Sequence, residues 1–478
     1  MQRPMESALT EVRLPIPEKL VGWGMHQHCY SPVFRPQTED EIIQAFQFAS
    51  NKGLPACIRG AGRSYGDASL NTDGILIETL SYNKIRAWDE NRGVVCAQSG
   101  IQMQQLAGFA LEKGYWLPVA PESMSMTLGG VMAMNLGGKN LHIAGNIGEH
   151  IWEFDLLTPM GKVFRCSREE NVELFYAAIS GLGFFGIFLE VKLILRKVHM
   201  GDLQVANLQK KNLEVMIDAM EELAPQTDYM SAWIDTFAHG ESLGRGVLSI
   251  ASYFAKDRVR NLKTFSPNRQ RLASRTFGIV PNRLLWFFLY PFANETGVRL
   301  WNYMKYHFSA QIAKGKQESC SRFCFSLDTI PNLRNIYKPG SSIRYQAVLP
   351  KRNAFKGITE ILKTCQRQEQ VVYFAKLSKH KKDTFLLSAA PEGYMISLDI
   401  PIVPETLARW EDTNHEIDEI VLQNSGKIFF ANDTILRPEL VKRILGNSVL
   451  KSLRKTKDLC DPQQILQSDL YRRLFGDI

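Results

Sequence analysis

Three glycine-rich segments lie within the first 190 residues of the chain, at residues 59–67, 121–148 and 180–187. Because glycine has no Cβ, the backbone N–H groups of such segments can approach a phosphate or a flat ligand closely. One segment of this kind is common in tight turns, but three in one region are difficult to explain by turns alone. The sequence therefore predicts a ligand held by the loops of the N-terminal part.

The first segment does not fit a Rossmann dinucleotide site. Its glycines, Gly60, Gly62 and Gly66, have the spacing G-x-G-x-x-x-G, which is one residue longer than the Rossmann fingerprint. A Rossmann motif also opens a helix directly and has an acidic residue about 20 positions further on. Here Tyr65 and Asp67 lead into another turn and a strand. The spacing and context indicate a backbone cradle of another kind.

Periodicity predicts an α+β region up to residue 198. Thr38 and Glu41 form a capping-box signature for a helix that ends at Gly53, and a second amphipathic helix is expected at residues 103–113. Short strands are expected at 54–58, 75–77, 85–88 and 94–97. We predict three divisions: an N-terminal domain at 1–198, a cap domain at 199–403, and a C-terminal segment at 404–478 that returns to the first domain.

The middle region differs from the N-terminal part in its sequence pattern. Two strand-rich runs, at residues 229–235 and 344–350, bracket a helical and basic stretch at 256–316. Within that stretch, residues 284–293 read LLWFFLYPFA, which is too short to span a bilayer. The segment is predicted to be either a buried helix or strand end, or an aromatic patch that contacts a membrane surface.

Composition limits the classes of ligand and compartment. The net charge of +8 is compatible with phosphates or lipid headgroups and is weak support for nucleic acid, which we do not expect as a partner. The eight cysteines include no CxxC pair, so we expect reduced thiols and no metal site. With no secretory signal and no long apolar run, the expected location is cytoplasmic, with peripheral contact at the inner membrane as the alternative.

The glycine segments carry a family resemblance. RGAGRSYGD, PESMSMTLGGVMAMNLGGKN and ISGLGFFGIFLEVKLIL resemble the FAD-binding domain of vanillyl-alcohol-oxidase-type flavoproteins. SAWID, SLDTIPNLRNIYKPGSSIRYQ and DPQQILQSDLYRRL extend the resemblance to the decaprenylphosphoryl-ribose 2'-oxidase group over most of the chain. The resemblance implies a two-domain α+β FAD-binding fold of the PCMH type, with a substrate or cap domain built on an antiparallel sheet.

The resemblance also implies roles for matching positions. The expected FAD contacts are Arg59, Gly60, Ala61, Gly62, Arg63, Ser64, Tyr65, Pro121, Ser123, Thr127, Gly129, Gly130, Ala133, Asn135, Gly183 and Ile187. The expected catalytic or substrate-side residues are Lys139, His142, Gln346 and Lys376. For His142, a structural role with a bond to the backbone is an equal alternative.

Two features concern how the flavin is held. Arg63 stands where covalent members of the superfamily have a flavin-linking histidine, and no cysteine lies between residues 118 and 148. Non-covalent FAD is therefore expected. The chain departs from the group at Gly137, where a histidine is usual, at Val403, where a lysine is usual, and at Asn432, which replaces the lysine of an AKD motif. Lys376 or Lys379 is the candidate replacement for the missing cation.

The resemblance predicts an FAD-dependent enzyme that oxidises a secondary alcohol of a sugar. The implied substrate is the C2 hydroxyl of a polyprenyl-phosphate-linked pentose, with a separate short-chain reductase completing an epimerisation in cell-envelope polysaccharide biosynthesis. Two alternatives stay open. One is a soluble sugar, alditol or aldonolactone oxidase that uses oxygen, although the C-terminal HxK motif of aldonolactone oxidases is absent. The other is a degenerate, non-catalytic flavin-binding module.

Overall fold

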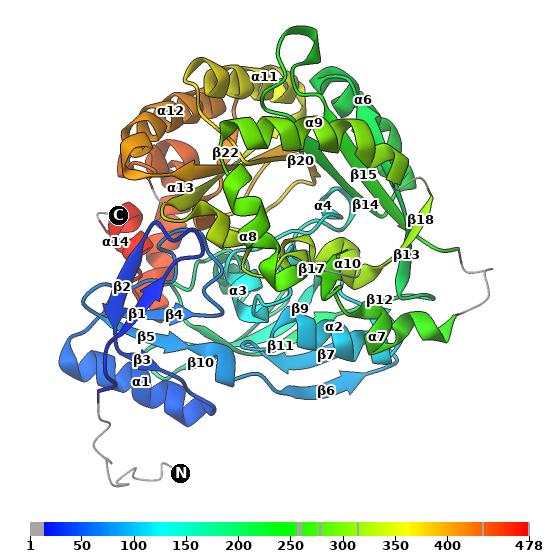
Figure 1. The fold of residues 1–478 in the computed structure, drawn as a ribbon. Coiled ribbons are helices and arrows are strands. Elements are labelled where there is room, and N and C mark those ends of the chain that lie inside the picture. Colours follow the sequence, from blue (N-terminus) through cyan, green and yellow to red (C-terminus); the bar gives the residue numbers. More distant parts are fainter. Residues whose placement is uncertain (1–13, 256–260, 277–279, 313–314, 433–434, 477–478) are drawn as a thin grey trace.

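The N-terminal part of the chain combines a small parallel sheet with a larger antiparallel one. A computed structural model describes residues 14–476 except 256–260, 277–279, 313–314 and 433–434 (Figure 1). In the parallel sheet, β5 (Ile75–Glu78) lies between β3 (Val33–Phe34) and β4 (Ala56–Arg59). The antiparallel sheet has the order β10 (Val163–Ser167), β9 (Ile151–Leu157), β11 (Ile187–Ile194), β7 (Val94–Gln98) and β6 (Ile85–Asp89).

The two helices expected in this part are confirmed, and their ends have clear causes. Helix α1 (Glu39–Lys52) begins after Thr38, whose Oγ1 accepts from the Glu41 backbone N–H at 3.3 Å. It ends at Gly53, which adopts a left-handed φ of 62° that favours glycine. Its apolar stripe, including Phe46, packs under the parallel sheet. Helix α2 (Met103–Glu112) follows β7.

The middle of the chain forms one eight-stranded antiparallel sheet, as expected for the cap. Its strands, in spatial order, are β18 (Lys316–Ser319), β13 (Asp202–Lys210), β15 (Gly246–Tyr253), β14 (Tyr229–Ile234), β20 (Phe374–His380), β21 (Gly393–Ile402), β19 (Ser341–Pro350) and β22 (Lys427–Ile428). Helices α6 (Leu213–Leu223), α11 (Lys351–Arg367) and α12 (Pro404–Gln423) cover one face (Figure 1). The short helix α4 (Leu141–Ala144) contacts β14 and β20.

The remaining strands pair in three two-stranded sheets, and further helices lie between the larger elements. The strands are β1 (Glu18–Val21), β2 (His28–Ser31), β8 (Tyr115–Trp116), β12 (Arg196–Lys197), β16 (Arg275–Thr276) and β17 (Val280–Pro281). The helices are α3 (Leu128–Ala133), α5 (Val172–Ala178), α7 (Pro267–Gln270), α8 (Leu285–Leu289), α9 (Glu295–Ile312) and α10 (Cys320–Cys324). All eight cysteines are buried, and none forms a disulfide in the structure. Within the described residues, no helix is both long and apolar enough to cross a membrane.

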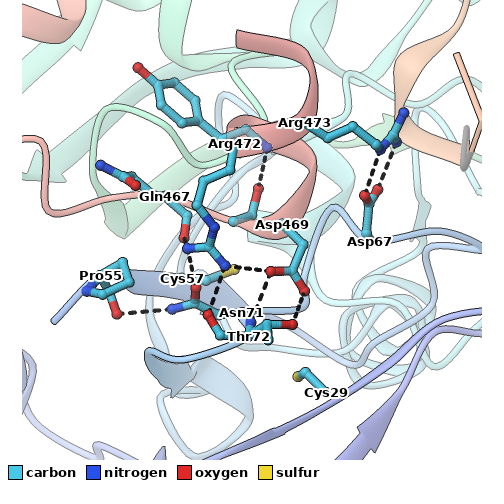
Figure 2. Close-up of polar contacts among 12 residues, drawn as sticks. Cys29, Pro55, Cys57, Asp67, Asn71, Thr72, Gln467, Asp469, Arg472 and Arg473 are labelled. Carbon is cyan, nitrogen blue, oxygen red and sulfur yellow. Dashed lines mark hydrogen bonds and ion pairs between the residues drawn. The ribbon is translucent and has the colours of Figure 1, made fainter. Parts of the chain in front are cut away.

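The C-terminal helices α13 (Pro438–Cys460) and α14 (Asp469–Phe475) lie against the N-terminal part. Arg473 forms a two-point ion pair with Asp67 at 2.9 and 3.0 Å, and Asp469 accepts from the backbone N–H of Thr72 at 2.9 Å (Figure 2). Strand β22 adds residues beyond 403 to the cap sheet. The division of the chain at residues 198 and 403 stays a prediction.

Candidate active site

One large cavity lies where the glycine-rich loops face the cap sheet. It contains about 1930 Å³ of space, part of it open to solvent. Its walls combine apolar side chains with a few convergent polar groups, which is typical of small-molecule and cofactor sites. The predicted site residues that line it are Gly60, Ala61, Gly62, Arg63, Ser64, Tyr65, Pro121, Ser123, Thr127, Gly129, Gly130, Ala133, Asn135, Gly183, Ile187, Gln346 and Lys376.

The first glycine loop presents backbone donors to this cavity. Among the residues that the structure describes, the N–H groups of Ala61 to Tyr65 donate to no protein acceptor, although all five residues line the cavity. Consecutive free N–H groups of this kind form a concave site for an anion such as a pyrophosphate. Position 60 has no room for a side chain, because a Cβ on Gly60 would lie 2.3 Å from Thr127 Oγ1. The residues present therefore fit a phosphate-bearing cofactor.

The opposite wall is one face of the cap sheet. Lys376, Ser378 and His380 alternate along β20 and all line the cavity, because side chains two residues apart share a face of a strand. Lys379 lies on the other face of β20, where its Nζ pairs with Glu221 of α6 at 2.7 Å. Of the two lysines considered as replacements for the missing cation, only Lys376 is at the cavity.

Gln346 lies at the centre of a polar chain on this wall. Its Nε2 donates to Ser397 Oγ at 2.7 Å, and its Oε1 accepts from Asn432 Nδ2 at 2.5 Å. The pairing of β19 with β21 places Gln346 directly opposite Ser397. Because both ends of the amide are held, its orientation toward the cavity is fixed before any ligand binds.

An ion-pair network joins the second glycine segment to the cap sheet. Lys376 Nζ lies 2.6 Å from Glu122 Oε1, and Arg344 Nη1 lies 3.7 Å from Glu122 Oε2. Burial raises the pKa of Glu122, but the two cations outweigh it and lower that pKa to about 2. Arg344 also binds Asp399 at 2.5 and 2.7 Å and lies over the Tyr65 ring. Glu122 is therefore an ionised group that holds Lys376 in place.

Arg63 is held by contacts within the protein. Its Nη2 donates to Ser123 Oγ at 2.7 Å and to Asp328 Oδ1 at 3.1 Å, and its guanidinium stacks on the Trp23 ring at 3.8 Å. Asp328 also accepts from the backbone N–H of Met124 at 2.5 Å. These contacts clamp the first two glycine segments to residues 326–329 of the cap region. No cysteine is among the described residues that line the cavity, in keeping with the expectation of non-covalent flavin.

Three predicted site residues do not line the cavity. Arg59 is buried and donates to the Ser69 carbonyl at 2.9 Å. Lys139 Nζ donates to the Phe323 carbonyl at 2.5 Å, and His142 Nε2 lies 3.0 Å from the Thr227 carbonyl oxygen. Burial lowers the pKa of both Lys139 and His142. The structure thus gives His142 the backbone-bonded position that was its alternative, and the catalytic roles of Lys139 and His142 stay untested predictions.

The departures from the family pattern divide into two sets. Gly137 and Asn432 line the cavity, so the missing histidine and the missing lysine of the AKD motif both concern the site. Val403 precedes α12 and is not a lining residue, so its change from lysine does not reach the cavity. Lys427 of β22 lines the cavity, and its Nζ donates to the Ile444 carbonyl. Lys427 is therefore a second lysine at the cavity, in addition to Lys376.

Sequence reasoning missed several lining residues. His380 is 2% exposed, and its Nδ1 has no hydrogen-bond partner within the described chain. Burial lowers the pKa of His380 to about 4, so its imidazole is neutral at pH 7. The alternation Lys376, Ser378, His380 could have indicated a shared face. No sequence signal places Asp383, which does not line the cavity itself. Its carboxylate accepts from two residues that do, Asn135 at 3.0 Å and Asn146 at 2.6 Å.

Comparison with known proteins agrees with this geometry. Residues 31–167 match the model of the FAD binding domain. Together with the glycine cradle, this match shows that the chain is an FAD-dependent oxidoreductase with the expected α+β FAD-binding fold. The resemblance seen in the motifs also extends over the whole chain. The chain is 26% identical to decaprenylphosphoryl-beta-D-ribose oxidase of Mycolicibacterium smegmatis over 471 residues, which cover 96% of this chain and 97% of the relative.

Two further relatives show how far the similarity extends. An uncharacterised protein of Streptomyces coelicolor is 24% identical over 78% of this chain and all of its own length. A putative D-arabinono-1,4-lactone oxidase of Neurospora crassa is 28% identical, but over only 33% of this chain and 28% of its own. The similarity to the lactone oxidase is therefore limited to part of each protein.

Proposed function

We propose that this protein oxidises the C2 hydroxyl of a polyprenyl-phosphate-linked pentose, as the first half of an epimerisation that a separate short-chain reductase completes. The observation that carries the proposal is the polar wall of Gln346, Lys376 and His380 facing the glycine cradle. A relative named for decaprenylphosphoryl-ribose oxidation aligns with nearly the whole chain, which supports the same substrate class.

The residues of the wall suit a sugar that must be held in one orientation. The backbone donors of Ala61 to Tyr65 and the second glycine segment would hold FAD. The chemistry that FAD would supply is acceptance of a hydride from the alcohol carbon. Gln346 would bind a sugar hydroxyl through its fixed amide. Lys376, oriented by Glu122, would stabilise negative charge that develops at the reacting centre.

The test is anaerobic mixing of the FAD-loaded protein with decaprenylphosphoryl ribose, followed by the visible flavin absorption. Loss of the flavin absorption with the lipid-linked sugar, and none with free ribose, is the result we expect. Reduction by free sugars or aldonolactones, with hydrogen peroxide formed in air, would favour a soluble sugar oxidase. No reduction by any of these compounds would favour a non-catalytic flavin-binding module.

The role of Lys376 can be tested separately with Lys376→Met. Removal of a charge that stabilises the reacting centre should slow flavin reduction about 10²-fold with little change in FAD affinity. Lys379→Met is the matched control, because Lys379 pairs with Glu221 on the opposite face of the same strand. Equal effects of the two substitutions on the reduction rate would contradict the role assigned to Lys376.

A further inference from the structure

Helix α9 turns Val298 and Asn302 toward the protein and several large apolar side chains toward solvent. Asn302 is 3% exposed and donates to Asp235 Oδ1 at 2.9 Å. The Ser309 carbonyl accepts from Asn207 Nδ2 of β13 at 3.3 Å. On the outer side, the exposed large apolar residues are Leu300, Trp301, Tyr303, Met304 and Phe308. A surface helix of a protein normally has the reverse arrangement.

The preceding segment is apolar on both sides. In α8, Trp286 and Leu289 pack inward on a cluster that includes Val298 and Tyr373. Phe287 is nevertheless 61% exposed. The exposed large apolar residues of this segment are Leu284, Phe287, Phe288, Tyr290 and Phe292. The turn Tyr290–Phe292 contacts both α8 and α9, and the two helices lie on the side turned to the viewer in Figure 1.

We call these ten exposed residues of α8, α9 and the turn between them the aromatic face. Monomeric proteins rarely expose a contiguous apolar patch of more than a few hundred Å², because its hydration is unfavourable. Within the described chain, no further element covers the aromatic face. A surface outside this chain is therefore needed to bury it.

The charge of the chain segment that carries the aromatic face indicates which surface this is. Residues 267–312 contain six lysine or arginine residues but a single acid, Glu295. Arg271, Arg275 and Arg283 are exposed and have no acidic partner within the described chain. A second copy of the chain would oppose like charges, whereas anionic lipid headgroups would neutralise them. Aromatic and aliphatic residues beside exposed arginines are typical of surfaces that lie in a bilayer interface.

We propose that the aromatic face docks on an anionic lipid bilayer. The face is also joined to the cavity. Helix α8 packs on residues Leu333–Tyr337, and the same connection carries Leu327, which lines the cavity, and Asp328, which clamps Arg63. The docked protein could thus bind the sugar end of a lipid-linked substrate while the polyprenyl chain of that substrate stays in the bilayer. This last point rests on the proposed function, whereas docking itself does not.

Vesicle flotation tests the docking. The FAD-loaded full chain is mixed with vesicles of phosphatidylcholine alone, or of phosphatidylcholine and phosphatidylglycerol in equal parts. We expect binding to the anionic vesicles that weakens with salt. The double variant Phe287→Ser, Phe288→Ser should lower the bound fraction at least tenfold, because two exposed rings lose their apolar contact. Phe355→Ser is the matched control, since Phe355 is 49% exposed on α11, which is not part of the aromatic face.

Three results would overturn the proposal: absence of binding by the unmodified protein, an equal loss in the control, or a dimer in sedimentation that only the double variant abolishes. The last result would show that a second copy covers the face. Anaerobic flavin reduction by a short-chain, water-soluble analogue of the lipid-linked sugar separates this proposal from the proposed function. Vesicle binding without any flavin reduction would leave docking in place and contradict the substrate.

Discussion

Replacement of His380 by glutamine removes a neutral imidazole that folding shields from water. Burial lowers the pKa of His380 from its usual 6.5 to about 4. Because the unfolded chain binds this proton more readily than the folded chain, stability is fully present above the unfolded pKa and is lost as the pH falls toward 4. The difference corresponds to about 3 kcal/mol over the full range.

Chemical denaturation of the unmodified protein and His380→Gln measures this contribution. From about pH 7.5 to about pH 5, the unmodified protein should lose about 2 kcal/mol of unfolding free energy relative to the variant. His239→Gln, at an exposed histidine, is the control and should follow the unmodified protein. A pH dependence that is the same with and without the His380 imidazole would refute the reasoning, because it would show that the side chain is not shielded.

Two further predictions concern the cradle and the C-terminal anchor. Gly60→Ala places a Cβ 2.3 Å from Thr127 Oγ1, and such overpacking should weaken FAD binding by about 1–3 kcal/mol in calorimetric titration. The control is Gly108→Ala, where a Cβ meets nothing within 4 Å. An unchanged affinity for FAD, or an equal loss in the control, would contradict the cradle. Asp67→Asn breaks the two-point pair with Arg473 and should lower the unfolding free energy in urea by about 2 kcal/mol, and no change would show that α14 is not anchored there.

The parts of the fold that depend on local signals could be predicted from the sequence. Thr38 and Gly53 define α1 because capping is a property of a few neighbouring residues. The glycine segments identified the cavity because close approach of the backbone requires glycine at particular positions. The aromatic run at 284–293 left two readings open, and the exposure of Phe287 and Phe288 favours the surface patch.

The parts that depend on tertiary contacts could not be predicted in this way. Glu122 binds Lys376 across 254 residues, and Asp383 joins Asn135 across 248. No local pattern specifies such pairs, since only the packing of the cap sheet on the loops brings them together. The family resemblance implied a site role for Lys139, but its amine donates to the Phe323 carbonyl.

The visible absorption spectrum of the purified protein, before and after acid precipitation, tests the central claim most directly. If the cavity holds FAD through backbone donors and side-chain contacts alone, the flavin bands should move wholly into the supernatant. Colour that stays in the pellet would contradict non-covalent binding. A colourless protein that also rejects added FAD would contradict the assignment of the glycine cradle as a flavin site.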